Sequence, residues 1–180
     1  MHKWLDAQFS DEQPFNETWV IVGGGELIDS IRHMDTVHQA DPTEVHWMCV
    51  ELLDITAKYL SNRLGWPLIV SQEGFQRTLT SSPQAEPIAP WVVTVSSFYR
   101  PETHTAFPEV PLDWRTTTDT IAAIGAKIIR ADELVLLKSF QVDPNASLQD
   151  FAVSGVVDEA LPTLDMGTVK IRTEHLPSDA

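Results

Sequence analysis

The feature that most constrains the fold is an apolar run followed at once by three glycines. Residues 19–22, Trp-Val-Ile-Val, are short, continuous and rich in β-branched side chains, which is typical of a strand buried on both faces. Gly23-Gly24-Gly25 ends the run, and the apolar residues that follow recur at helical spacing. Segment 19–32 therefore predicts a strand, a glycine loop and a helix of an α/β domain. Such a loop presents backbone N–H groups to an anionic ligand, although a tight turn without a ligand is the alternative.

Composition and charge limit the classes of function. The chain of 180 residues is long enough for one domain, which we take as 1–180 with an N-terminal arm or helix end over 1–17 and a polar tail over 172–180. A net charge of −14 argues against binding to nucleic acid or to anionic membranes. No apolar run reaches the ~18–20 residues of a transmembrane helix and the start lacks a signal-peptide core, so we expect a cytoplasmic protein.

Neither cysteine nor histidine spacing indicates a metal site. The single Cys49 excludes an internal disulfide, and its apolar helical surroundings in the sequence are typical of a packed thiol. The six histidines show no ligand spacing, so no metal is expected. His46 lies in the first turn of a predicted helix, where it either packs, meets solvent or faces a ligand.

A long helix is the most clearly delimited element. Asp41 is a predicted N-cap, Pro42 fills the first helical position, Glu44 completes a capping box and Gly65 stops the helix, which predicts a helix over 42–64. Its apolar groups lie on more than one side. We therefore expect a homodimer, or a higher homo-oligomer, that forms through this helix.

The remaining segments alternate between strands and helices. The expected strands are 67–70, 90–95, 133–137 and 168–171, and the expected helices are 120–130 and 148–153. A loop or small hairpin is expected over 72–89, and irregular structure over the proline-containing 96–114. The alternation predicts an α/β fold, a three-layer αβα sandwich with a mainly parallel sheet.

Candidate site residues follow the predicted strands, because ligands of open α/β sheets bind beyond the carboxyl ends of the strands. They are the three glycines, Ser71, Ser96-Ser97, Thr116-Thr117-Thr118-Asp119 and Lys138-Ser139. Glycine N–H groups and a lysine together suit a phosphate, although a solvated Lys138 and a helix-start Asp119 are the plain alternatives. Neither a Walker A motif nor Gly-x-Gly-x-x-Gly occurs.

These segments resemble the amino acid kinase superfamily of aspartate/glutamate/uridylate kinase-like proteins. The closest branch is that of the small aminomethylfuran phosphate kinase of methanofuran synthesis. The matching segments are 21–26 with Asp29, Arg32 and Asp35, then 46–48, 114–123 and 136–139.

The resemblance implies ATP with Mg²⁺, and phosphoryl transfer to a carboxylate or phosphate on a small acceptor. By position, Asp119 and Lys138 would be the catalytic residues. The residues implied for the acceptor or the transferred phosphate are Gly23, Gly24, Gly25, Asp29, Arg32 and His46. Those implied for the nucleotide are Thr117, Thr118 and Ser139.

Two parts of the family pattern differ in this sequence. The usual first strand, a lysine followed by Gly-Gly-Ser, does not occur in the residues before Gly23, and the later Asp-Gly-Val/Ile loop is replaced by 141–145, Gln-Val-Asp-Pro-Asn. Either the natural start lies upstream or the chain is a degenerate kinase. Three functions follow: a small-molecule kinase serving one-carbon cofactor synthesis, a non-catalytic nucleotide- or oxoanion-binding regulator on the same scaffold, or an assembly subunit.

Overall fold

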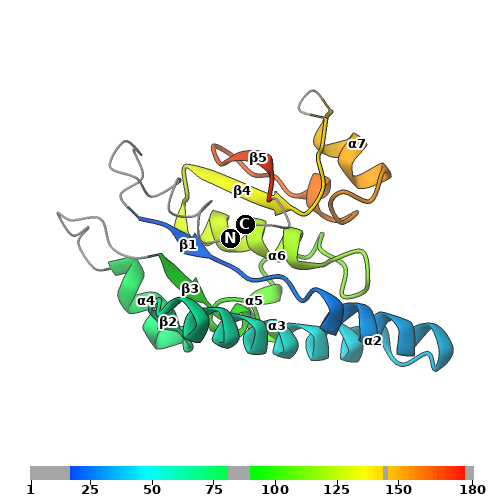
Figure 1. Cartoon of the computed structure of the whole chain (residues 1–180), viewed down its shortest axis with the longest axis horizontal. Helices are drawn as coiled ribbons and strands as arrows, with labels where there is room; N and C mark the ends of the chain where they lie inside the picture. Colours follow the sequence, from blue (N-terminus) through cyan, green and yellow to red (C-terminus); the bar gives the residue numbers. More distant parts are fainter. Residues whose placement is uncertain (1–16, 81–89, 144–145, 177–180) are drawn as a thin grey trace.

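The computed structural model describes residues 17–80, 90–143 and 146–176 (Figure 1). The α-helices are α2 (Glu26–Val37), α3 (Pro42–Leu64), α4 (Gln72–Thr80), α5 (Pro101–His104), α6 (Thr118–Ile129) and α7 (Leu148–Val153). The strands are β1 (Trp19–Val20), β2 (Leu68–Ile69), β3 (Trp91–Val93), β4 (Glu133–Lys138) and β5 (Lys170–His175). Two 3-10 turns are η1 (Val95–Ser97) and η2 (Leu161–Thr163). The chain thus has a mixed α/β fold.

All strand pairs in the described part of the chain are parallel. One sheet has the order β1-β3-β2, with Trp19 opposite Trp91 and Leu68 opposite Val92. The other pairs β4 with β5, from Glu133 opposite Lys170 to Lys138 at its far end. The sequence predicted one mainly parallel sheet. The parallel pairing agrees with that expectation, but the strands that are described form two separate short sheets.

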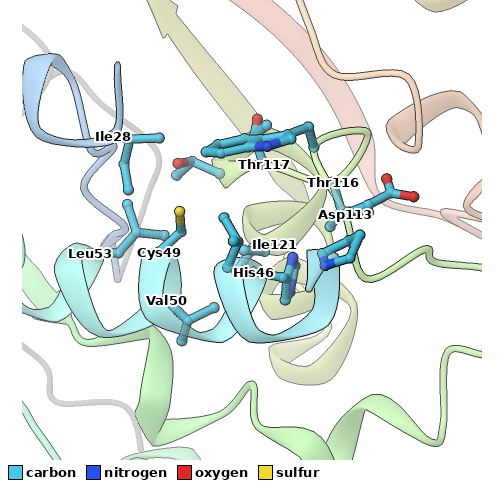
Figure 2. Close-up of a pocket in the computed structure, with 13 residues that line it drawn as sticks. Ile28, His46, Cys49, Val50, Leu53, Asp113, Thr116, Thr117 and Ile121 are labelled. Carbon is cyan, nitrogen blue, oxygen red and sulfur yellow. The ribbon is translucent and has the colours of Figure 1, made fainter. Parts of the chain in front are cut away.

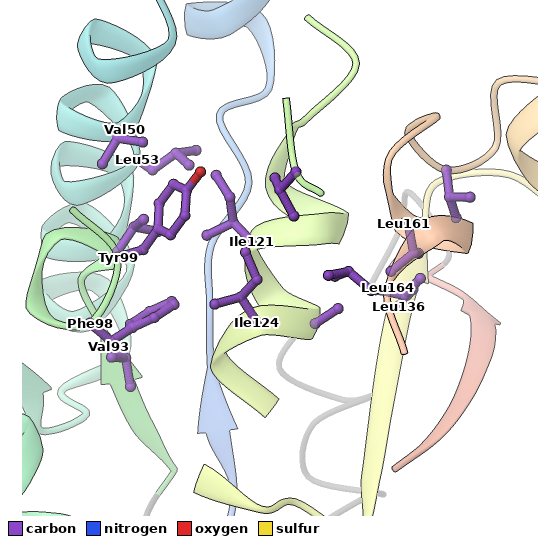
Figure 3. Close-up of a cluster of buried hydrophobic side chains, with 14 of the residues drawn as sticks. Val50, Leu53, Val93, Phe98, Tyr99, Ile121, Ile124, Leu136, Leu161 and Leu164 are labelled. Atoms are coloured by element: carbon purple, nitrogen blue, oxygen red, sulfur yellow. The ribbon is translucent and has the colours of Figure 1, made fainter. Parts of the chain in front are cut away.

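Helix α6 lies between these two parts of the molecule. Every residue from Thr120 to Ala126 is buried, as expected for a helix that is apolar all round and covered on more than one side. In Figure 3, Ile121 and Ile124 face Val50 and the aromatic rings after β3 on one side, while the other side of the helix meets the layer formed by β4 and η2. The hydrophobic core is therefore continuous through α6.

Helix α3 has the bounds that the sequence predicts. The Asp41 carboxylate accepts hydrogen bonds from the backbone N–H groups of Thr43 (2.9 Å) and Glu44 (3.1 Å), and Pro42 occupies the first turn. Gly65 ends the helix in the left-handed conformation, with φ of 68°. Figure 1 shows α3 along one side of the molecule, with α2 beside its N-terminal end.

The expectation of a loop or hairpin over 72–89 is wrong for 72–80, which form α4; residues 81–89 lie outside the described part. The Ser71 hydroxyl accepts a hydrogen bond from the N–H of Gly74 (3.1 Å) and so starts this helix. Phe75 is buried, with its ring edge-on to Trp19 (5.2 Å between centroids) and stacked on Phe98 (5.5 Å). The segment is therefore helical despite its polar composition, because burial of Phe75 against Trp19 and Phe98 stabilises the helix.

The structure differs from the sequence prediction near the C-terminus. Strand β5 extends to His175, because each residue from Lys170 onward pairs with β4, so residues 172–175 do not belong to a polar tail. The expected arm over 1–17 falls almost wholly outside the described residues. No helix within 17–80, 90–143 or 146–176 is long and apolar enough to cross a membrane.

Candidate functional site

A small cavity lies where α2, α3, α6 and the loop before α6 meet (Figure 2). It measures about 30 Å³, which is far below the roughly 300–1,000 Å³ of pockets that hold drug-sized ligands. The apolar residues that line it are Ile28, Pro42, Val45, Val50, Leu53 and Ile121. The others are His46, Cys49, Asp113, Trp114, Thr116, Thr117 and Thr118.

The glycine loop leads into α2, whose Ile28 lines this cavity. A Cβ at Gly24 would come within 1.8 Å of Ile28 Cγ1, and Gly25 has φ of +52°, so both positions require glycine for packing or conformation. Gly23 differs, because a Cβ there would lie 3.9 Å from Thr118 Oγ1, in ordinary contact. Gly23 thus lies beside the first residue of α6. Packing explains why Gly24 is glycine, and the positive φ explains why Gly25 is, so neither position requires a ligand.

The N-terminus of α6 already holds a carboxylate of this chain. One oxygen of Asp158 accepts hydrogen bonds from the backbone N–H groups of Thr117 (2.7 Å) and Thr120 (3.0 Å) and from the Thr117 hydroxyl (3.0 Å). The other oxygen accepts from the Thr120 hydroxyl and from Leu161 N–H (3.0 Å). Asp158 therefore takes the place at this helix start that an anionic ligand would occupy.

Asp119 and Lys138 form an ion pair next to this helix start. Lys138 Nζ lies 2.9 and 2.8 Å from the two carboxylate oxygens of Asp119, and both side chains are mostly buried. Burial raises the pKa of the Asp119 carboxyl, and the Lys138 ammonium opposes this shift. The last residue of β4 is thereby fixed to the first turn of α6.

Helix α2, which has no buried residues, is attached to the loop before α6 through Trp114. The indole N–H of Trp114 donates to Asp35 (2.7 Å) and lowers the pKa of that carboxyl. The Arg32 guanidinium lies 4.8 Å from the ring centroid and is paired with Asp29 (2.6 Å). These contacts hold Trp114, which lines the cavity, against α2.

His46 is a buried histidine that faces the cavity from α3 (Figure 2). It is 5% exposed, and its Nε2 lies 3.1 Å from the Tyr99 hydroxyl. Burial, with a smaller contribution from nearby His104, lowers its pKa to about 4. The ring is therefore neutral near pH 7. The sequence left open whether His46 packs, meets solvent or faces a ligand; in the structure it is packed and also lines a cavity.

The structure brings some of the predicted site residues together and leaves others apart. His46, Thr117 and Thr118 line the cavity, and Gly23 lies beside Thr118. Asp119 and Lys138 pair with each other outside the lining, and Ser139 is exposed and does not line the cavity.

Several residues of the site could not be singled out by sequence patterns. Asp158 stands in an unremarkable Val-Asp-Glu stretch, and Tyr99 and His104 lie within the segment expected to be irregular. Asp35 and Trp114 occur in the motif segments of the kinase resemblance, which was the one signal for them.

Comparison of the chain with protein-family models and with curated proteins found no match. Among the described residues, no group of three or more histidine, cysteine, aspartate or glutamate side chains is placed to hold a metal ion.

Gly24→Ala tests whether the glycine loop is close-packed. The new Cβ would displace the Ile28 side chain, so we expect the free energy of unfolding in urea to fall by about 1–3 kcal/mol. Gly23→Ala is the matched control and should change it by less than about 0.5 kcal/mol. Equal losses for the two variants would contradict the packing described for Gly24.

The lowered pKa of His46 predicts a pH dependence of stability. The folded state holds this imidazole neutral down to about pH 4, whereas the unfolded chain protonates it near 6.5, so stability is lost as the pH falls from 6.5 to 4. The shift corresponds to a loss on the order of 3 kcal/mol. In urea unfolding measured between pH 6.5 and pH 4, His46→Gln should reduce the dependence of the free energy of unfolding on pH. His33→Gln, at an exposed position, should leave that dependence unchanged. An unchanged dependence in His46→Gln would contradict the assignment.

Proposed function

We propose that this chain is an amino acid kinase-like domain that binds the phosphate groups of ATP and transfers one to a carboxylate or phosphate on a small acceptor. In this proposal its two short parallel sheets belong to a three-layer αβα arrangement. The observation that carries it is the convergence of three features at the start of α6. These are the glycine loop beside Thr118, Asp119 in the first turn, and Lys138 from the end of β4.

The chemistry asked of these residues is positioning and charge neutralisation. Phosphoryl transfer spreads negative charge over the phosphate oxygens, and it needs cations and N–H donors more than a covalent group. Lys138 supplies the cation, and Asp119 holds its ammonium in place. Gly23 itself has no side chain to keep a phosphate away, and a Cβ built there would meet only Thr118 Oγ1, at 3.9 Å.

Among the described residues near the start of α6, the carboxylates of Asp113, Asp119 and Asp158 are already paired and do not form a Mg²⁺ site. Both oxygens of Asp119 face Lys138, and both oxygens of Asp158 accept hydrogen bonds from N–H or O–H groups. Asp113 is bound in bidentate fashion by Arg115, with its nearest contact at 2.7 Å. We therefore assign no metal-dependent step to these carboxylates. The cavity of about 30 Å³ is also too small for a nucleotide, so the proposal places ATP at the glycine loop and Lys138.

A second candidate is a non-catalytic domain that binds a nucleotide or an oxoanion. It is favoured by Asp158, because this carboxylate already uses two of the N–H groups at the start of α6. Fewer donors then remain for a transition state, whereas a ground-state phosphate can still bind at the glycine loop and Lys138.

Calorimetry of the full chain with ATP, with and without Mg²⁺, tests the proposal. We expect binding that Lys138→Ala weakens about tenfold or more, because one charge-assisted hydrogen bond contributes roughly 1.5–3 kcal/mol. Lys58→Ala on the exposed face of α3 is the matched control and should bind as the wild type does. Turnover of ATP with an acceptor separates the kinase from the binding protein.

Lys138→Ala leaves Asp119 buried without its cation, so a second variant is needed. The double change Asp119→Asn with Lys138→Met removes both charges and should also lose affinity while its unfolding stays cooperative. Absence of ATP binding to the wild-type chain, or wild-type affinity in both variants, would overturn the proposed role of Lys138.

We also propose that α3 mediates a homodimer. Met48, Ile55 and Tyr59 are 51%, 53% and 71% exposed, and their spacing of seven and four residues places them on one face of the helix. Light scattering should give twice the chain mass, and Ile55→Glu should give the monomer mass because it puts a charge within the apolar interface. Lys58→Glu, which changes charge without removing an apolar group, is the control, and a monomeric wild type at micromolar concentration would contradict the proposal.

A further inference from the structure

Three side chains form a hydrogen-bonded row from the cavity to the surface. His46 Nε2 lies 3.1 Å from the Tyr99 hydroxyl oxygen, and the same oxygen lies 3.2 Å from His104 Nδ1. Tyr99 is fully buried, His46 lines the cavity, and His104 on α5 is partly exposed. The row therefore joins a wall of the cavity to solvent through a residue that water does not reach.

The single hydroxyl proton of Tyr99 limits how the row can be arranged. Tyr99 donates to one of the two histidines and accepts from the other. In the arrangement that passes a proton inward, the hydroxyl donates to Nε2 of His46 and its oxygen accepts from Nδ1–H of His104. The neutral His46 ring then carries its own proton on Nδ1.

We propose that His46, Tyr99 and His104 form a proton relay between the cavity and solvent. A proton taken up from water at Nε2 of His104 allows its Nδ1 proton to pass to the Tyr99 oxygen. The Tyr99 hydroxyl proton passes at the same time to Nε2 of His46. The products are a protonated His46, a neutral tyrosine and a neutral His104 in its other tautomer, so one proton enters and no charge is left on Tyr99.

The surroundings of the row keep it dry and leave few charges near it. The Trp47 ring contacts all three members, with centroids 5.0 Å from His46, 5.2 Å from Tyr99 and 6.2 Å from His104. The charged groups that act on the histidines are Glu109 near His104 and Asp113 near His46, and Arg115 pairs with the latter. Cys49, which lines the cavity together with His46, has a pKa raised by burial and stays a thiol near neutral pH.

The relay gives the cavity an acid-base function that the proposed phosphate centre lacks. Phosphoryl transfer to a carboxylate or phosphate needs no proton from His46, so the relay would serve a titratable N–H or O–H group small enough to enter a cavity of about 30 Å³. It does not depend on ATP binding, and failure of either proposal leaves the other testable.

Exchange of the buried Tyr99 hydroxyl proton with solvent tests the relay in the full chain. NMR reads this rate from the splitting that a mixture of light and heavy water produces in the tyrosine Cζ signal. We expect His104→Gln to slow the exchange about 100-fold, the low end of what a positioned proton-transfer group contributes, because an amide cannot pass a proton on. His33→Gln on the exposed face of α2 is the matched control and should leave the rate unchanged.

Two further readings separate the relay from a structural role. Backbone amide exchange in α3 should be the same in both variants, which would show that opening of the fold does not set the rate. Nitrogen-15 spectra of the histidine rings should show Nδ1–H in both His46 and His104, and Tyr99→Phe should release His104 from that tautomer. Equal hydroxyl exchange in wild type and His104→Gln, or an Nε2–H tautomer of His104 in the wild type, would overturn the relay.

Discussion

The interaction on which the rest of the structure depends is the contact between the Asp158 carboxylate and the start of α6. A helix that begins inside a protein has N–H groups that neither the helix nor water can satisfy. Asp158 accepts five hydrogen bonds from Thr117, Thr120 and Leu161, and each charge-assisted bond of this kind contributes roughly 1.5–3 kcal/mol. With this carboxylate in place, the apolar sequence of α6 can be buried along seven consecutive residues.

The position of α6 then determines how the two sheets relate to the site. On one side the helix packs against α3 and the aromatic residues after β3, and on the other it contacts β4 and η2 (Figure 3). Asp119 of α6 pairs with Lys138 at the end of β4, and Thr118 of α6 lies beside Gly23 of the glycine loop. The proposed phosphate centre is thus made of side chains and backbone that the burial of α6 has already fixed.

The parts of the fold that were predictable are those with local causes. Asp41 and Gly65 mark the ends of α3 because capping and the left-handed conformation depend on a few neighbouring residues. The glycine loop was predictable for the same reason, since an apolar run that stops at three glycines admits few other conformations. By contrast, α4 forms because Phe75 finds Trp19 and Phe98, which lie far from it in the sequence.

The site was predictable only in part, for a related reason. The sequence pointed to Asp119 and Lys138 as neighbours of strand ends, and their pairing across 19 residues agrees with antiparallel packing of α6 and β4, which puts the start of the helix beside the end of the strand. Asp158 contacts Thr117 across 41 residues, and Tyr99 meets His46 across 53, so no local pattern marks either contact. The division of the strands into two sheets also depends on such distant contacts.

The central claim is that phosphate groups bind where the glycine loop, Thr118 and Lys138 converge. The most direct measurement is a map of backbone amide and lysine ammonium chemical shifts as ATP is added to the full chain. The account predicts that the largest shifts occur at Gly23, Gly25, Thr118 and Lys138, and that the amides of Thr117 and Thr120, which Asp158 already binds, shift less. Saturating ATP that leaves the glycine loop and Lys138 unshifted would contradict the account.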